Sequence, residues 1–414
     1  MNKSFHIHYL KLFIAIFALI ALTGCSLAPA YTDPDTGKLE AEVARISLLK
    51  KSSIKTIYST DTNVFFIMNN ASVLASGCND YGLLGQGDTD KYDYVVHVKL
   101  PERIKLISAD GTIAAAVSDT NNVYIWGDLS GWDSGSLTTT DDNFTYKKFS
   151  FAEIVTDISV NTNHIAVLTK KGSVYTLGYN YGQLGYDLSE NFKGRFYPDF
   201  RQIETDVFAT KIETSSTATY MISDSGQIYG CSYNEYYELG YIDSLGTVNR
   251  IDSTTSFTSL TTAGHNLFAL SSDGDVYVCG QNTNGVLGLN STLATAAALT
   301  KVPFDGNIKI KSICGRDSNS TVFFLTTENK VYACGTNTNN ELYTENTSVA
   351  VTAPSLVKIG EASAFYGMGA SKFYLDARKH LYTYGDNTYG QMPTVEANNK
   401  GSFVMPTRIY ANVK

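Results

Sequence analysis

Residues 259–288 read SLTTAGHNLFALSSDGDVYVCGQNTNGVLG, and this stretch contains the pattern that decides the fold. Residues 267–270 (LFAL) form a short apolar run, and residues 276–279 (VYVC) form a second one. The Asp-Gly pair at 273–274 lies between them and favours a tight turn with positive φ. Gly280 interrupts the second run directly after its last residue. The stretch therefore predicts a β-hairpin of two short strands.

The same pattern recurs seven times along the chain. Each copy has an aliphatic residue that is usually followed by tyrosine, at Val73-Leu74, Val123-Tyr124, Val174-Tyr175, Ile228-Tyr229, Val276-Tyr277, Val331-Tyr332 and Leu381-Tyr382. Four residues after the aliphatic position comes a slot that holds Gly77, Gly127, Gly178, Ser232, Gly280, Gly335 and Gly385. The steps between these slots are 50, 51, 54, 48, 55 and 50 residues. A fixed period of about fifty residues indicates a repeat architecture.

One repeat predicts about four short strands with two apolar faces, which it cannot bury alone. Packing seven such units around an axis buries both faces, so we expect an all-β, seven-bladed β-propeller. The last run, Phe403–Tyr410 (FVMPTRIY), resembles the segments that precede each hairpin, but no hairpin follows it. We expect it to complete the first blade, whose hairpin lies near residues 54–77. The propeller would then be closed by joining the N- and C-terminal strands.

The loops after the slot resemble a known repeat motif, in which a strand ends in Gly and is followed by Asn and Gly-Gln-Leu-Gly. Residues 178–185 read GYNYGQLG, residues 77–85 read GCNDYGLLG and residues 280–288 read GQNTNGVLG. This motif resembles the repeats of the regulator of chromosome condensation family, and the resemblance covers roughly residues 50–414. It implies a seven-bladed propeller.

The resemblance weakens in three copies. Copy two reads GDLSGWDSG, copy four has Ser232 and Tyr237 in place of glycines, and copy six has Asn340. The best-known member of the family exchanges nucleotide on a nuclear GTPase. The repeat motif is structural, however, and it carries no catalytic residue to transfer to this chain.

The N-terminus predicts export. Lys3 and Lys11 precede or flank an apolar stretch of 11 residues at 12–22 (LFIAIFALIAL), which is shorter than the roughly 20 residues that span a bilayer. Leu22-Thr23-Gly24-Cys25 follows and resembles a bacterial lipobox, although an ordinary signal peptide with a chance cysteine is the alternative. We expect a lipoprotein signal peptide at 1–24, lipidated Cys25 and a flexible tether at 25–45, and the propeller at 46–414. The chain would be anchored by lipid to a membrane of the bacterial cell envelope, with the propeller outside the cytoplasm.

Composition limits the class of partner. Only 17% of residues are charged, and removal of the two lysines of the signal segment would take the formal net charge from −8 to −10. An acidic surface disfavours nucleic acid, whose phosphates repel it. We therefore expect a protein or glycan partner, and a monomer.

Cysteine and histidine positions favour packing over chemistry. Five cysteines follow Cys25, and three of them (Cys231, Cys279 and Cys334) occupy one repeat slot that elsewhere holds Trp126, Leu177 or Tyr384. A slot shared with large apolar residues predicts buried thiols rather than disulfides or a metal site. His164 is expected to bond to the backbone at a repeat position.

No catalytic signature is present in the sequence, since it has no G-x-S-x-G elbow, P-loop or HExxH motif. We expect no enzyme activity, no cofactor and no metal. A hydrolase with its site in the axial depression and a guanine-nucleotide exchange factor are the less favoured functions.

The candidate binding surface is aromatic. Tyrosines follow equivalent strand ends in copies three and four, and residues 192–201 (FKGRFYPDFR) lie between them. Tyr and Arg dominate protein interfaces because they bury much area at low entropic cost. The candidate residues are Tyr179, Tyr186, Arg195, Phe196, Tyr233, Tyr237 and Tyr241. The alternative is that tyrosines such as Tyr181, Tyr81 and Tyr389 are repeat-structural and that residues 196–200 form an outer strand.

These residues predict a lipid-anchored binding or scaffold module, inhibitor-like in that a rigid ring presents loops to a protein. The second hypothesis is a carbohydrate- or cell-wall-binding module, because planar aromatic rings also stack on sugars.

Overall fold

The computed structural model describes residues 47–51, 53–130, 138–139, 144–186, 193–240, 246–251, 254–291, 293–316, 319–338, 340–367, 369–393, 403–409 and 413. These residues belong to one compact unit, Val43–Lys414. The expected signal peptide, Cys25 and most of the tether lie outside the described residues. A short helix, α3 (Ser47–Lys51), precedes the first strand. Within the part of the chain that is described, no helix has both the length and the apolar character needed to cross a membrane.

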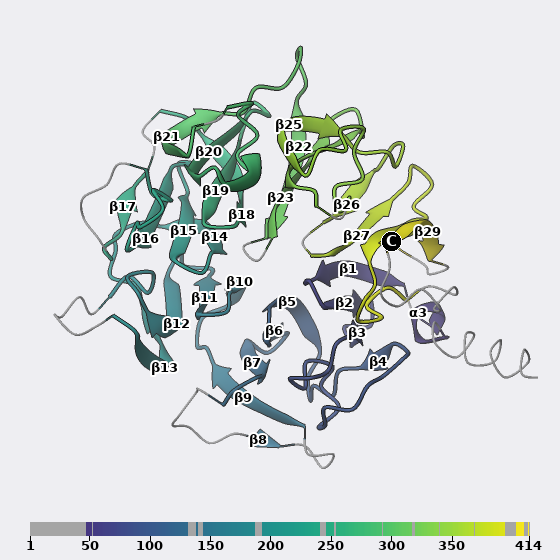
Figure 1. Ribbon diagram of the computed structural model, residues 1–414. Coiled ribbons are helices and arrows are strands. Elements are labelled where there is room, and N and C mark those ends of the chain that lie inside the picture. The colour runs from purple at the N-terminus through teal and green to yellow at the C-terminus, as the bar shows by residue number, and fades with distance from the viewer. Residues whose placement is uncertain are drawn as a thin grey trace, which may run out of the picture. The chain divides into compact units, whose positions relative to one another are not determined.

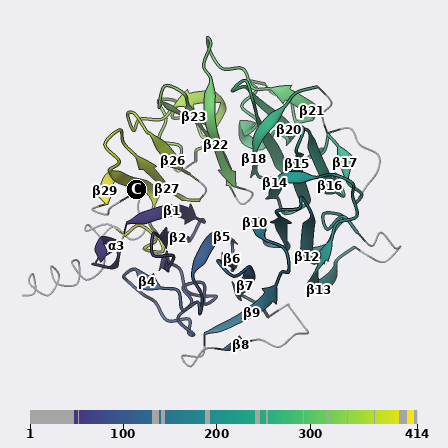
Figure 2. The same ribbon diagram turned by 180° about the vertical axis from the view of Figure 1, so that it is seen from behind.

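The described strands form seven antiparallel sheets arranged in a ring, which Figures 1 and 2 show from its two sides. Each sheet is a continuous stretch of chain whose strands follow one another outward from the axis. Blade one comprises β1 (Ile54–Ser59), β2 (Asn63–Met68), β3 (Val73–Gly77) and β4 (Val96–His97). Blade two comprises β5 (Ile104–Asp110), β6 (Ile113–Ser118), β7 (Asn122–Gly127) and β9 (Thr145–Ser150), and the short strand β8 (Thr138–Thr139) pairs with β9 at the outer edge of this sheet. Blade three comprises β10 (Val155–Val160), β11 (His164–Thr169), β12 (Val174–Asn180) and β13 (Arg195–Gln202).

The remaining blades repeat the arrangement. Blade four comprises β14 (Ala209–Thr214), β15 (Ala218–Ser223), β16 (Ile228–Ser232) and β17 (Asn249–Arg250), and blade five comprises β18 (Phe257–Ala263), β19 (Asn266–Ser271), β20 (Val276–Gln281) and β21 (Thr295–Lys301). Blade six comprises β22 (Ile310–Arg316), β23 (Asn319–Thr326), β24 (Val331–Thr336) and β25 (Ala350–Leu356), and blade seven comprises β26 (Ala364–Tyr366), β27 (Ser371–Leu375), β28 (Leu381–Asp386) and β29 (Phe403–Ile409). The prediction of a seven-bladed β-propeller is confirmed.

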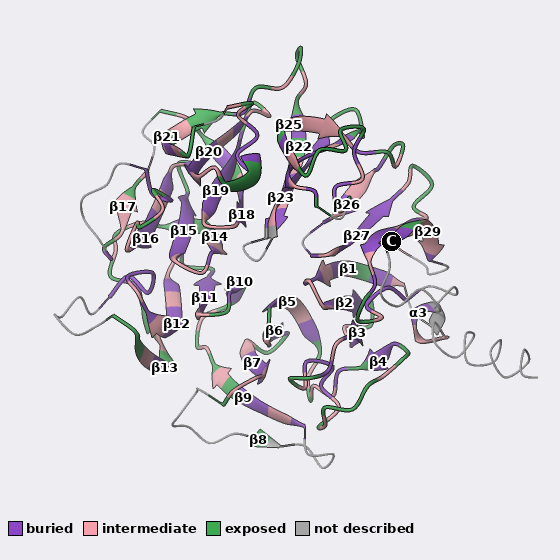
Figure 3. Ribbon diagram, in the orientation of Figure 1, coloured by how far each residue is buried: buried purple, intermediate pink, exposed green. Residues whose placement is uncertain are grey.

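The hairpin expected in copy five is also confirmed. Strand β19 pairs with β20 so that Leu270 lies opposite Val276, and Gly274 in the turn has a φ of 79°. All six residues of β19 are buried, and β2, β6, β11 and β15 share this pattern. Successive side chains of a strand point to opposite faces. A strand that is buried throughout therefore has a neighbouring blade on each side (Figure 3).

The glycine slot is explained by a close backbone approach. Gly77 has a φ of 124°, and a Cβ atom there would lie 2.1 Å from the carbonyl oxygen of Thr62. The same geometry recurs in blade six, where a Cβ on Gly335 would lie 2.0 Å from the carbonyl oxygen of Ser320. Only glycine combines this φ with this contact, so the repeat motif marks the point where the third strand passes the turn between the first two.

The core lies between blades rather than inside them, because each sheet presents one apolar face to either neighbour. Phe65 of blade one meets Trp126 of blade two edge-on, with ring centroids 6.3 Å apart. Phe268 of blade five and Phe324 of blade six have ring centroids 6.4 Å apart, with the rings tilted at 55° to each other. All four side chains are fully buried.

Ring closure differs from the expectation. Strand β29 does not complete blade one, because it pairs with β28 as the outer strand of blade seven, with Val404 opposite Gly385. Blade one has its own outer strand, β4. The ring is closed by side-chain packing between complete blades, in which Phe66 meets Phe373 edge-on at 6.1 Å. An isolated bridge joins Ile54 to Val413, and Leu49 and Ile409 belong to one buried cluster near the two described chain ends.

The slot before the glycine links neighbouring blades by hydrogen bonds. Its donor groups reach the main-chain oxygen of a loop residue in the preceding blade. The pairs are Trp126 to Leu83 (2.9 Å), Cys231 to Gln183 (3.2 Å), Cys279 to Glu238 (3.3 Å) and Cys334 to Val286 (3.2 Å). The three cysteines are fully buried, and burial raises the pKa of the Cys231 thiol to about 12. These thiols are protonated donors and not nucleophiles.

Candidate binding face

Two kinds of connection emerge on the same side of the ring: the turns between the first two strands and the longer loops between the third and fourth strands of each blade. This side is called the long-loop face here. The connections between blades, and the turns between second and third strands, emerge on the opposite face. This assignment follows from the antiparallel order within every sheet.

Exposed apolar side chains are concentrated on the long-loop face. Among the described residues, nine large hydrophobic side chains are exposed, and six of them lie in loops between third and fourth strands. These six are Tyr81, Tyr94, Tyr237, Leu293, Val349 and Tyr389, which are 41–68% exposed. Ile154 and Phe208 are on the opposite face and Met405 is on β29. Exposed apolar groups gathered on one side of a protein mark an interaction surface.

The same loops are acidic. Their described residues include nine carboxylates but only two lysines, Lys91 and Lys193. The carboxylates are Asp80, Asp88, Asp90, Asp93, Asp128, Glu235, Glu238, Glu341 and Glu345. The long-loop face therefore combines exposed tyrosines with negative charge, a combination that suits a basic partner surface.

The candidate residues of copy three form an edge group on blade three. Phe196 of β13 lies opposite Tyr179 of β12, and their rings are 5.0 Å apart. Arg195 is exposed, and its guanidinium carbon lies 5.2 Å from the ring centre of the buried Tyr197. Tyr186 is only 8% exposed and donates its hydroxyl proton to the main-chain oxygen of Thr176. It belongs to the packing of the blade and is not accessible to a partner.

The candidate residues of copy four are more accessible. Tyr237 is 41% exposed and has a φ of 58°, in the slot that Gly82, Gly285 and Gly390 occupy in other copies. Positive φ is unfavourable for a bulky residue. A tyrosine at this position is therefore less favourable for the local backbone than the glycine found in other copies. Tyr241 lies outside the described residues, as does Cys25.

Tyr233 lines a hollow of about 180 Å³ between blades three and four on the long-loop face. Tyr181 and Tyr236 line it too, together with Lys193, Glu235 and Glu238. The sequence singled out Tyr233 but treated Tyr181 as a repeat-structural position. It missed the hollow because the turns that complete it, at residues 163 and 216–217, are distant in sequence.

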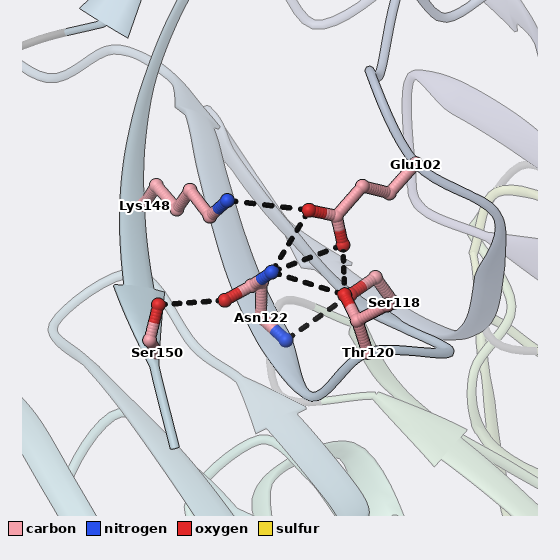
Figure 4. Close-up of polar contacts among 6 residues, drawn as sticks. All are labelled: Glu102, Ser118, Thr120, Asn122, Lys148 and Ser150. Carbon is pink, nitrogen blue, oxygen red and sulfur yellow. Dashed lines mark hydrogen bonds and ion pairs between the residues drawn. The ribbon is translucent and has the colours of Figure 1, made fainter. Parts of the chain in front are cut away.

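A polar network on the opposite face is satisfied within the protein (Figure 4). Glu102, in the connection from blade one to blade two, accepts hydrogen bonds from Asn122 Nδ2 at 2.8 and 3.0 Å and pairs with Lys148 at 3.2 Å. Thr120 also donates to Glu102, and Ser150 donates to Asn122 Oδ1 at 2.6 Å. Each of these groups has a partner from the same blade or its connection, so the network holds the blade together.

Electrostatics at Glu102 agree with a structural role. Burial alone would raise the pKa of its carboxyl group. Hydrogen bonds from Ser118, Thr120, Tyr124 and Asn122 outweigh burial and hold the pKa well below its ordinary value of 4.5. The carboxylate is therefore charged at neutral pH, and the surrounding hydrogen-bond donors stabilise this negative charge.

His164 is buried, but its partner differs from the expectation. Its Nε2 atom lies 2.8 Å from the hydroxyl of Thr219 in blade four, not from a backbone atom. Thr219 gives its proton to the carbonyl oxygen of Gln183, so Nε2 donates to Thr219. Burial lowers the pKa of His164 to about 3. A neutral, enclosed imidazole of this kind is unsuited to act as a general base near pH 7.

No family model matches the chain. The chain is 24% identical over 297 residues to the regulator of chromosome condensation of Xenopus laevis, a match that covers 66% of this chain and 69% of that protein. It is 26% identical to the human regulator of chromosome condensation over 42% of this chain, and 27% identical to the Arabidopsis thaliana ultraviolet-B receptor UVR8 over 48% of it. Each of these two matches covers 46% of the relative. These matches support repeats of the regulator of chromosome condensation type in this chain.

Two solved structures have the same overall fold. Human WBSCR16 superposes with a TM-score of 0.65 at 19% identity, over 77% of this chain and 85% of that one. Prp20p of Saccharomyces cerevisiae superposes with a TM-score of 0.62 at 16% identity, over 76% and 80%. The chain spans about half or less of the length of several curated relatives, including 20% of mouse serine/threonine-protein kinase Nek9. The solved structures show the fold and the curated relatives support the repeat type, while the whole-protein activities of these relatives do not transfer to this chain.

Proposed function

We propose that this chain is a lipid-anchored, extracytoplasmic scaffold that binds a basic protein partner through its long-loop face. The observation that carries this proposal is the one-sided distribution of exposed large hydrophobic residues, since six of the nine found among the described residues lie on that face. Tyrosine supplies large rigid contact area, and the surrounding carboxylates supply orientation and rapid encounter with a positive surface. Relatives named as regulators and as a receptor support a role in interaction for this repeat fold.

Replacing Tyr81, Tyr237 and Tyr389 together by alanine should weaken partner capture by about fivefold or more, since one anchor is commonly worth over about 1 kcal/mol. Capture is measured by cross-linking and affinity purification of the full chain from detergent-solubilised cells, followed by titration of the recovered partner. The melting temperature should stay nearly unchanged, because the three rings are 41–48% exposed.

The matched control replaces Ile154 and Phe208, which are 50% and 47% exposed on the opposite face. Capture that falls equally in both variants, or in neither, would move the interface away from the long-loop face. Retention of a glycan in place of a protein would instead support the carbohydrate-binding hypothesis.

Anchoring is tested separately through Cys25. Cys25→Ser should abolish incorporation of a labelled fatty acid and leave the chain uncleaved or mislocalised, because the lipid is attached to that sulfur. Cys78→Ser is the matched control, and it should keep the label. Label that persists in the Cys25→Ser variant would contradict the lipobox assignment, without bearing on the binding face.

A further inference from the structure

We propose that the hollow between blades three and four is a receptor for a positively charged side chain, lysine or arginine, of the protein partner. This inference deepens the proposed function and rests on it for the identity of the partner. The hollow is open on the long-loop face, and its wall contains three tyrosine rings and two carboxylates. Aromatic faces combined with carboxylates form the surroundings that ammonium and guanidinium groups favour.

A lysine of the chain itself already occupies this position. The Lys193 ammonium lies 4.1 Å from the ring centre of Tyr233 and 3.3 Å from the carboxylate of Glu235. The side chains of Lys193 and Glu235 are 51% and 53% exposed. An exposed ion pair contributes little net free energy. Lys193 is therefore a weakly held internal occupant that a better-placed cation can displace.

Glu238 adds a negative charge that the fold does not require. The equivalent residues Gln183 and Gln391 each accept a main-chain N–H and donate to a main-chain oxygen of the strand end. Glu238 accepts the main-chain N–H of Tyr236 at 2.8 Å, and accepts the hydroxyl of Ser232 at 2.5 Å.

The change from Gln to Glu in copy four is thus matched by a change from Gly to Ser. The local hydrogen bonds are kept while the wall of the hollow gains a carboxylate. Glu238 is fully buried, and a buried carboxylate beside an opening attracts a cation strongly because little water screens it.

A neutral sugar fits these surroundings less well. One face of Tyr236 is covered by His265, whose ring is stacked on it at 4.0 Å and 7°. The Lys193 ammonium lies over the ring of Tyr233, 4.1 Å from its centre. A sugar that displaced this ammonium would leave Glu235 without its cation. The positive group of an incoming lysine or arginine would take over both contacts of the Lys193 ammonium, the one with the Tyr233 ring and the one with the Glu235 carboxylate.

The test measures binding of N-acetyl-arginine amide to the full chain in detergent by calorimetry. Lys193→Ala should tighten binding several-fold because it vacates the hollow. Glu238→Gln should weaken binding by roughly tenfold, as expected for the loss of one charged partner. This variant should fold normally, since glutamine occupies the same slot in copies three and seven.

The matched control is Asp80→Asn, which removes one exposed carboxylate from the same face in blade one and should leave binding unchanged. Equal losses in Asp80→Asn and Glu238→Gln would show general attraction to an acidic face and overturn the proposal. Binding of oligosaccharides in place of the arginine probe would overturn it as well. Because the probe needs no partner, failure here is distinct from failure of protein capture.

Discussion

Phe373→Ala should lower the free energy of unfolding by about 3–5 kcal/mol, the usual loss for a large-to-small change at a buried phenylalanine. Phe373 is fully buried and meets Phe66 across the seam between blades seven and one. No strand is shared across this seam, so side-chain packing carries most of the contact, together with hydrogen bonds from Ser76 to the main-chain oxygen of Gly390 and from Gln391 to that of Asp61. Equilibrium unfolding in urea, with the midpoint and slope recorded for each variant, measures the loss.

Two matched variants make this result decisive. Phe268→Ala removes an equally buried ring from an interface within the chain, between blades five and six, and should cost the same. Phe208→Ala changes a ring that is 47% exposed and should cost less than about 0.5 kcal/mol. A loss below about 1 kcal/mol for Phe373→Ala, with a full loss for Phe268→Ala, would mean that the seam is open in solution.

Glu102→Gln should cost about 1.5–3 kcal/mol at pH 7, the usual range for hydrogen bonds to a charged group. The folded-state pKa of Glu102 lies below its ordinary value of 4.5. Its stabilisation is therefore fully present above pH 4.5 and is lost as the pH falls through the lower, folded-state pKa. The difference between the parent and the variant should stay constant from pH 7 to the ordinary pKa of 4.5 and shrink as unfolding is measured at lower pH.

Glu345→Gln is the control for this titration, because it removes a carboxylate that is exposed. Its effect should be within about 0.5 kcal/mol at every pH. A constant difference between Glu102→Gln and the parent across the acid range would show that the carboxylate charge is not what the surrounding donors recognise.

The repeat pattern was sufficient to predict the number of blades and the inner hairpins, because those strands are buried on both faces and require apolar runs at a fixed interval. It was insufficient for the outer strands. The run at 403–410 resembles the segments that precede each hairpin and has no hairpin after it, so it was assigned to blade one. The structure instead places 403–409 beside β28, as the outer strand of blade seven.

The candidate site was predicted less well than the fold. Tyrosines of one sequence class have different environments: Tyr186 is 8% exposed while Tyr81 and Tyr389 are 48% and 45% exposed. Each of these tyrosines follows a strand end, and sequence spacing does not reveal which ring folds under its loop. The exposure of Tyr81 and Tyr389 was therefore missed, although both occupy the loop position that the repeat defines.

The seam has a consequence for how such a chain can be rearranged. Every blade is one uninterrupted stretch, and Ile54 and Val413 lie beside each other at the two ends. Linking these ends and cutting any connection between two blades would leave all seven sheets whole. Such a permutation keeps the order of the blades around the axis and changes only the blade at which the chain begins, so the packing of the ring does not require the chain to start at blade one.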